Sequence, residues 1–153
     1  AGGRHEETPA VDGLIASERA AGLDRAATFE NFATRIDALK GDLTGLLARL
    51  KADGKRIVGY GAPAKATTLM YAFELDAHVL DFIVDESPLK QGFFTPGLHL
   101  PVLAPAVLDE RTPDYLLILA WNFARPIMEN NARYAESGVR FIVPSPTVEV
   151  LPS

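Results

Sequence analysis

The sequence predicts an α/β fold, a Rossmann-like, doubly wound and mainly parallel sheet preceded by a long amphipathic helix. Short apolar segments alternate with helical segments from residue 54 onward, the pattern of parallel strands joined by right-handed helical crossovers. A glycine-rich turn follows the first apolar segment. Residues 24–53 carry apolar side chains at spacings of three and four, which is typical of a single helix. We expect one compact unit, with linker and helices over residues 1–53 and the Rossmann-like domain over residues 54–153.

Composition excludes several classes of function. The chain has 153 residues, no cysteine and a net charge of -5, so disulfides, thiolate zinc sites and cysteine nucleophiles are excluded. His5, His78 and His99 are too far apart in sequence for a metal-ligand pattern, and we predict no metal site. Without a basic cluster, nucleic acid and anionic membranes are not expected partners. No apolar run approaches the roughly 20 residues of a membrane span, and residues 1–10 do not resemble a signal peptide, so we expect a cytoplasmic protein.

The N-terminal third predicts two helices. Thr8 is a candidate N-cap before Pro9, and Gly22 is expected to end a short helix. Within residues 24–53 the pattern predicts an amphipathic helix of about seven turns, ended by Gly54. Its apolar stripe is expected to pack on the sheet, because the pattern is too short for a coiled coil. The stripe comprises Phe29, Phe32, Ile36, Leu39, Leu43, Leu46, Leu47 and Leu50.

The remaining elements follow in alternation. The expected strands are "RIVGY" (56–60), "HVLDFIVD" (78–85), a short edge strand "HLPV" (99–102), "PDYLLILAW" (113–121) and "VRFIVP" (139–144). The expected helices are residues 63–75, with Leu69, Met70 and Phe73 facing inward, a single turn in 104–110, and residues 124–138. The strand at 113–121 is the most apolar, so we place it beside the first strand at the centre of the sheet.

The glycine turn, residues 59–64, matches the G-x-G-x-x-G/A pattern of dinucleotide-binding folds. In that pattern the first glycine permits a tight turn, the second lets a phosphate approach the backbone, and free N–H groups at the helix start favour an anion. Here the expected donors are the N–H groups of Gly61, Ala62 and Ala64. Asp85 stands 24 residues after Gly61, where an acidic residue bonds ribose hydroxyls. Two alternatives remain open. The glycines could serve only to form this turn, and Asp85 could serve only to form the turn after the second strand. The candidate binding residues here are Gly59, Tyr60, Gly61, Ala62, Lys65, Thr67 and Asp85.

Two more polar clusters are expected on the same sheet edge. Lys90 and Gln91 begin a turn-rich loop after the second strand, and Trp121 and Asn122 follow the most apolar strand. An aromatic face and an amide suit a base or a sugar ring. Alternatively, Trp121 covers the core and Asn122 is a helix N-cap. An S-adenosylmethionine (SAM) site is disfavoured, because the residues before the glycine turn, Arg56-Ile57-Val58, include no acid.

Three segments together resemble the C-terminal domain of the sugar C-methyltransferase family, SAM-dependent enzymes that alkylate nucleotide-linked deoxysugars. They are "GYGAPAKATTLM", "VDESPLKQGFFTPGLHLPV" and "LLILAWNFARPIMENNARYAESGVRFIVPSP", and the resemblance runs from about residue 11 to the end. It implies a substrate-side domain that holds a nucleotide-linked sugar and binds no cofactor itself. SAM and zinc would belong to upstream domains of the same polypeptide, and no catalytic residue is assigned here. By this resemblance the chain is inactive alone.

Two other interpretations stay open at this point. The G-x-G-x-x-A pattern with Asp85 also fits a stand-alone dinucleotide-binding module of an oxidoreductase. The glycine turn could instead be purely structural, in an interaction domain that docks through its long N-terminal helix.

Overall fold

The computed structural model describes residues 8–152, which cluster into two compact units divided between residues 38 and 39. The first unit contains α1 (Pro9–Ala20) and the start of α2 (Ala26–Ala52). The sequence places the boundary after residue 53, but the C-terminal half of α2 clusters with the sheet. Pro9 begins α1 as predicted, and Gly22 follows its end with a φ of +71°.

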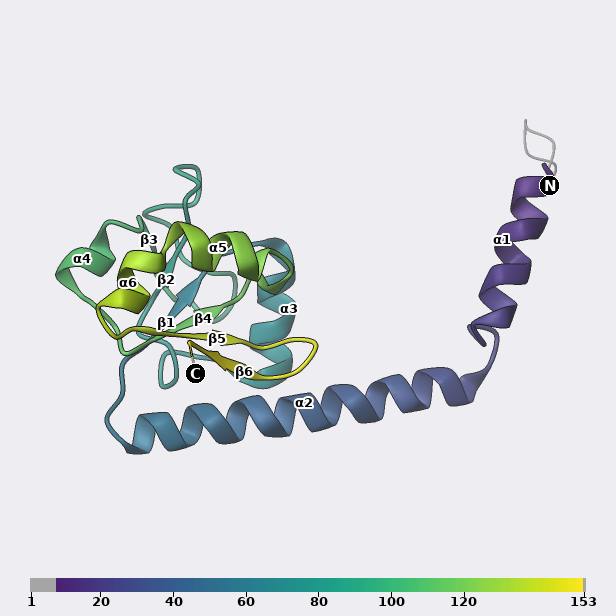
Figure 1. Ribbon diagram of the computed structural model, residues 1–153, viewed down its shortest axis with the longest axis horizontal. Helices are drawn as coiled ribbons and strands as arrows, with labels where there is room; N and C mark the ends of the chain where they lie inside the picture. The colour runs from purple at the N-terminus through teal and green to yellow at the C-terminus, as the bar shows by residue number, and fades with distance from the viewer. Residues whose placement is uncertain (1–7, 153) are drawn as a thin grey trace. The chain divides into compact units, whose positions relative to one another are not determined.

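The second unit is built on a six-stranded sheet in the order β3-β2-β1-β4-β5-β6 (Figure 1). The strands are β1 (Ile57–Tyr60), β2 (Ile83–Val84), β3 (Val102–Leu103), β4 (Tyr115–Ile118), β5 (Arg140–Val143) and β6 (Glu149–Leu151). All neighbours pair in parallel except β5 and β6, which are antiparallel. The predicted pairing of β1 with β4 at the centre is confirmed, with Ile57 opposite Tyr115 and Tyr60 opposite Ile118. Strand β6 was not predicted.

One face of the sheet is covered by α3 (Ala64–Phe73) and the C-terminal half of α2. Leu43, Leu47 and Leu50 of α2 are buried in the same cluster as the predicted inner face of α3. The N-terminal half of the predicted stripe is exposed rather than buried, since Phe29 and Phe32 are 55% and 53% exposed. Gly54, with a φ of +70°, follows α2 as predicted.

The opposite face is covered by α4 (Val107–Glu110), α5 (Ala124–Asn130) and α6 (Ala132–Glu136), so the sheet is doubly wound. The sequence predicted one helix over residues 124–138, but it is broken at Asn131. The Asn131 side chain is buried and donates to the carbonyl of Ile127 at 2.8 Å and to the hydroxyl of Tyr60 at 3.0 Å. Asparagine side chains compete with helical backbone bonds in this way.

The second predicted strand, residues 78–85, is reduced to Ile83–Val84. The preceding residues form a turn instead, because Asp76 accepts hydrogen bonds from the backbone N–H groups of His78, Val79 and Leu80. The predicted edge strand is present as β3, shifted toward Val102–Leu103. Over residues 8–152 we find no helix that is both long and apolar enough to cross a membrane.

Candidate functional site

The candidate site lies where β1, β2 and β4 end. The strand order reverses between β1 and β4, and ligands of open α/β sheets bind at the carboxyl ends of strands at such a reversal. The turn after β1 is held against both neighbours, because the N–H of Gly61 donates to the carbonyl of Val84 at 2.7 Å and the N–H of Leu119 donates to the carbonyl of Tyr60 at 2.9 Å. Residues 61–65, 85–92 and 119–123 therefore form one edge.

The two glycines of the motif have different roles. Gly59 lies inside β1, and a Cβ there would stand 2.9 Å from Cδ1 of Leu119. Its role is close packing within the sheet, so the prediction that it permits a tight turn was wrong. Gly61 makes the turn with a φ of +88°, and a Cβ there would stand 2.9 Å from the Cβ of Ala120. Gly61 therefore lets the loops after β1 and β4 touch.

Asp85 is buried at the end of β2 and is fully engaged within the protein. Its Oδ2 accepts hydrogen bonds from the N–H of Ala62 at 2.6 Å and from Nζ of Lys90 at 3.0 Å, and its Oδ1 accepts from the N–H of Ser87 at 2.9 Å. Burial of the carboxyl group opposes ionisation, but these three donors outweigh it and hold the pKa of Asp85 below its usual range. The carboxylate is therefore ionised at neutral pH.

These contacts reduce the number of N–H groups that the glycine turn can offer to an anion. The N–H groups of Gly61 and Ala62 are bonded to Val84 and Asp85, and Pro63 has no N–H. Of the three N–H groups expected to meet a phosphate, those of Gly61, Ala62 and Ala64, two are thus used internally. The turn offers an anion fewer donors than its sequence pattern predicts.

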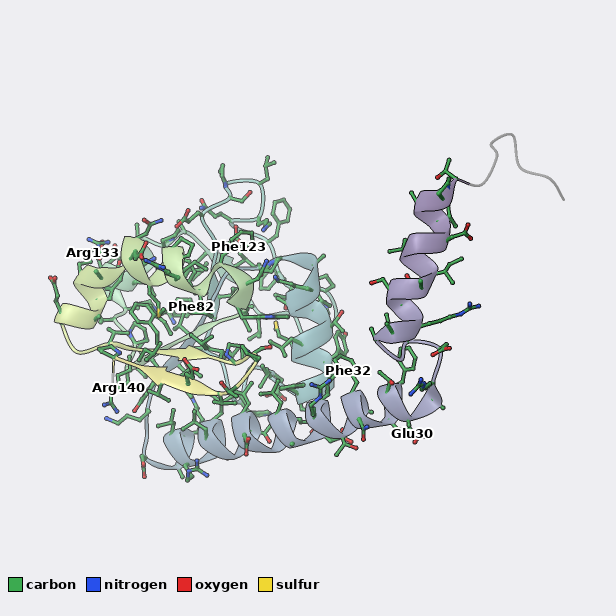
Figure 2. All side chains as sticks on the ribbon, turned by 45° about the vertical axis from the view of Figure 1, so that its right-hand side comes forward. Glu30, Phe32, Phe82, Phe123, Arg133 and Arg140 are labelled. Carbon is green, nitrogen blue, oxygen red and sulfur yellow. The ribbon has the colours of Figure 1, made fainter. Side chains whose placement is uncertain are left out.

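Lys65 and Trp121 meet across the reversal point. The 3-10 turn η1 (Trp121–Phe123) follows β4 and places its aromatic rings beside the start of α3. The Nζ of Lys65 lies 4.6 Å from the ring centroid of Trp121 and 5.8 Å from that of Phe123. Figure 2 labels Phe123. Such cation–π contacts hold an ammonium group over a ring face.

The two alternatives for Trp121 and Asn122 have different outcomes. Trp121 is partly buried and packs against both core clusters, so it does cover the core while also contacting Lys65. Asn122 is exposed inside η1, and the residue that caps α5 is Phe123. Asn122 is therefore not the N-cap of that helix.

Tyr60 points to the other face of the sheet. Its hydroxyl donates to Oε1 of Glu86 at 2.8 Å and accepts from Nδ2 of Asn131 at 3.0 Å. Burial raises the pKa of Tyr60 to about 12; the bond from Asn131 acts against this, and the Glu86 carboxylate adds to it. Tyr60 lies in the core cluster under α5 and α6, against which Trp121 also packs. No sequence pattern marks Glu86 or Asn131, because both are ordinary polar residues in a turn and a predicted helix.

A cavity of about 200 Å³ lies between α3 and the loop of residues 89–96. Thr67 and Lys90 line it, as do several apolar residues. Gln91 belongs to the same loop, and its Nε2 donates to the carbonyl of Asp85 at 2.9 Å. The lining also includes Phe93 and Phe94, which are 66% and 62% exposed. Sequence reasoning missed these two, although adjacent phenylalanines in a polar loop were the available signal.

The backbone of this loop is paired with the edge strand β3. The N–H of Gly92 donates to the carbonyl of Val102 at 2.9 Å, and the N–H of Val102 donates to the carbonyl of Phe93 at 2.8 Å. The cavity wall is therefore an extension of the sheet. Within residues 8–152 no three histidine, aspartate or glutamate side chains gather as a metal site would require.

Comparison with known proteins decides the family. The family model described as the C-methyltransferase C-terminal domain matches residues 1–146. The chain belongs to this family. It is also 38% identical over 147 residues to the C-methyltransferase NovU of Streptomyces niveus, an alignment that covers 96% of this chain and 35% of that protein. This C-methyltransferase C-terminal domain thus spans about a third of the length of its curated relative, and the matched region contains the whole candidate site.

Proposed function

We propose that this domain holds the nucleotide-linked sugar for a SAM-dependent sugar C-methyltransferase and has no SAM site of its own. The observation that carries the proposal is the arrangement around the first turn of α3. An apolar cavity lies on one side of this turn, and the ammonium group of Lys65 is held over Trp121 on the other. A nucleotide-sugar has both an uncharged ring to bury and a diphosphate to neutralise.

Lys65 is the group we assign to the diphosphate. Its side chain is partly buried and held by two aromatic rings, so less side-chain freedom is lost when it binds an anion. An ammonium group has three N–H donors, and those directed away from the ring remain free for phosphate oxygens. Asn122, exposed on the same turn as Trp121, adds an amide next to it.

The methyl transfer itself is assigned to other parts of a longer polypeptide. The chain contains no cysteine for a thiolate zinc site, and no acid precedes the glycine turn. We propose that SAM-binding and zinc domains upstream supply these groups and are partners of this domain. The alternative of a dinucleotide-binding module of an oxidoreductase is less well supported, because the carboxylate that would bind the ribose hydroxyls, Asp85, is already bonded to three donors.

Calorimetric titration of the 153-residue chain with thymidine diphosphate (TDP), a TDP-linked sugar (TDP-sugar), NAD and SAM tests this proposal. We expect heat of binding from the TDP-sugar and weaker binding of TDP. NAD and SAM should give no more signal than buffer. Binding of NAD in preference to the TDP-sugar would favour the oxidoreductase module. No binding of any of the four would favour a structural or interaction role.

A further inference from the structure

We propose that the cavity beside the glycine turn binds a flat, uncharged ring, and that Asp85 excludes phosphate groups from it. The inference rests on the proposed function, in which the ring would be the base of the nucleotide. It reverses the usual expectation for a glycine turn of this pattern, because the anion would then be held outside the turn.

The first argument is the supply of hydrogen-bond donors. A phosphate beside the turn would need the N–H groups of Gly61 and Ala62, which are bonded to Val84 and Asp85. Pro63, which also lines the cavity, has no N–H to offer. A polar or charged group that is buried without partners is strongly disfavoured. With two of its N–H groups occupied and none on Pro63, the turn is poorly supplied with donors for an anion.

The second argument is charge. Among the described residues that line the cavity, Lys90 alone has an ionisable side chain, and its Nζ lies 3.0 Å from Oδ2 of Asp85. The positive charge is thus already paired. The Asp85 carboxylate, only 7% exposed, would repel a second anion placed near it. An incoming diphosphate would therefore find no unpaired positive charge among the lining residues, because Lys90 is already paired with Asp85.

The third argument is the size and lining of the cavity. A cavity of about 150 Å³ with apolar walls is known to hold benzene, so this one, at about 200 Å³, suits a single ring with substituents. It is too small for a whole nucleotide-sugar, since ligand pockets of that class measure roughly 300–1,000 Å³. Phe93 and Phe94 offer exposed ring faces at its solvent side. Stacking on aromatic side chains is the common way to hold a base.

Asp85 also positions the loop that carries these rings. Its Oδ1 accepts from the N–H of Ser87, and its carbonyl accepts from Nε2 of Gln91. One residue therefore occupies a donor of the glycine turn, the N–H of Ala62, and holds the aromatic wall in place. A pre-organised wall lowers the ordering cost of binding.

The first test is an amide NMR titration of the 153-residue chain with three probes: a nucleoside without phosphate, inorganic pyrophosphate, and the TDP-sugar. We expect the nucleoside to shift the amides of Thr67, Phe93 and Phe94. Pyrophosphate should leave these amides and that of Ala62 unmoved. Pyrophosphate shifting the cavity amides as strongly as the nucleoside does would overturn the proposal.

Two sets of variants sharpen the test. Phe93→Ala and Phe94→Ala remove exposed rings, and at least one should weaken nucleoside binding by about 5- to 100-fold. Phe32→Ala is the matched control, because Phe32 is 53% exposed and belongs to the other compact unit; it should bind like the wild type. Asp85→Asn keeps the shape but removes the charge, and we expect it to bind pyrophosphate at least about tenfold more tightly. Should this variant fail to fold, the wild-type titrations still decide.

The outcomes separate this inference from the proposed function. A TDP-sugar that binds without shifting the cavity amides overturns the inference and leaves the proposed function standing. A nucleoside that fills the cavity while the TDP-sugar does not bind supports the inference and overturns the proposed function. If none of the probes binds, both are wrong.

Discussion

The ammonium group of Lys65 lies over the indole of Trp121, with Nζ 4.6 Å from the ring centroid. This contact joins the start of α3, which follows β1, to η1, which follows β4. The strand order reverses between β1 and β4. A positive charge in the first turn of a helix is unfavourable by roughly 0.3–1 kcal/mol, and an exposed cation–π contact returns about 0.5–1 kcal/mol. Lys65 is thus close to neutral for stability, which makes a ligand-binding role testable without a large effect on folding.

Replacing Lys65 by alanine should weaken binding of the TDP-sugar by about 1.5–3 kcal/mol, the range for a hydrogen bond to a charged group. The melting temperature without ligand should change little, because the two local terms nearly cancel. Calorimetry and thermal melting measure the two quantities. Lys40→Ala is the control, since Lys40 pairs with Glu74 away from the site and its loss should leave affinity unchanged. Equal affinities of the Lys65 variant and the wild type would remove Lys65 from the site.

Gly61→Ala should lower the free energy of unfolding by about 2–4 kcal/mol, because it combines an unfavourable positive φ with crowding against Ala120. Gly54 also has a positive φ, +70°, but a Cβ there has nothing within 4 Å. Gly54→Ala should therefore cost only about 1–2 kcal/mol. Urea denaturation of both variants isolates the crowding term, and equal losses would show that the contact with Ala120 is easily relieved.

Acid should weaken the contribution of Asp85 to stability. Although burial opposes its ionisation, the N–H groups of Ala62 and Ser87 and the ammonium of Lys90 hold its folded-state pKa below the unfolded value, which is about 3.9. The contribution is therefore complete above about pH 4 to 5 and is lost as the pH falls through the folded-state pKa. Denaturation of wild type and Asp85→Asn from pH 7 to pH 3 should show the stability difference shrinking below about pH 4. A difference that stays constant over this range would show that the carboxylate charge does not contribute.

Tyr60→Phe should reduce stability by about 0.5–1.5 kcal/mol, because it removes the hydroxyl that joins Glu86 and Asn131. Binding of the TDP-sugar should be unchanged, since this hydroxyl lies on the face covered by α5 and α6. Chemical denaturation and calorimetry on the same preparation measure both effects. A loss of affinity larger than the loss of stability would return Tyr60 to the binding site.

The 153-residue chain alone should transfer no methyl group. Its glycine turn lacks the preceding acid of a SAM site, and it has no cysteine. Incubation with radiolabelled SAM and a TDP-ketosugar should give only background incorporation, with a full-length C-methyltransferase as the positive control. Clear turnover by the purified chain would show that the domain carries its own cofactor site.

The parts of the fold that the sequence predicted are those fixed by local pattern. The pairing of β1 with β4 follows from their continuous apolar character, and the inner face of α3 follows from spacing. The break at Asn131 depends on a hydrogen bond to Tyr60, 71 residues earlier in the chain, which no local pattern encodes. β6 likewise exists only because it pairs with β5.

The sequence predicted that the candidate residues share one sheet edge, but not the hydrogen bonds that they make there. The sequence brought Asp85 and the glycine turn to the same edge, because the carboxyl ends of parallel strands meet there. It could not show that the Asp85 carboxylate accepts the N–H of Ala62 rather than a ribose hydroxyl, since the pattern is the same in either case. The Phe93–Phe94 pair was missed because periodicity has no meaning in a loop without regular structure.

The pairing of the aromatic loop with β3 also bears on solubility. β3 is an outer strand of the sheet, and an exposed strand edge is a template on which further chains add and aggregate. The bonds that the N–H of Gly92 donates to Val102 and that the N–H of Val102 donates to Phe93 occupy that edge. A substitution that loosened the loop would therefore uncover unpaired backbone and two phenylalanine rings together, so the segment that forms the cavity wall also protects the protein from sheet-to-sheet self-association.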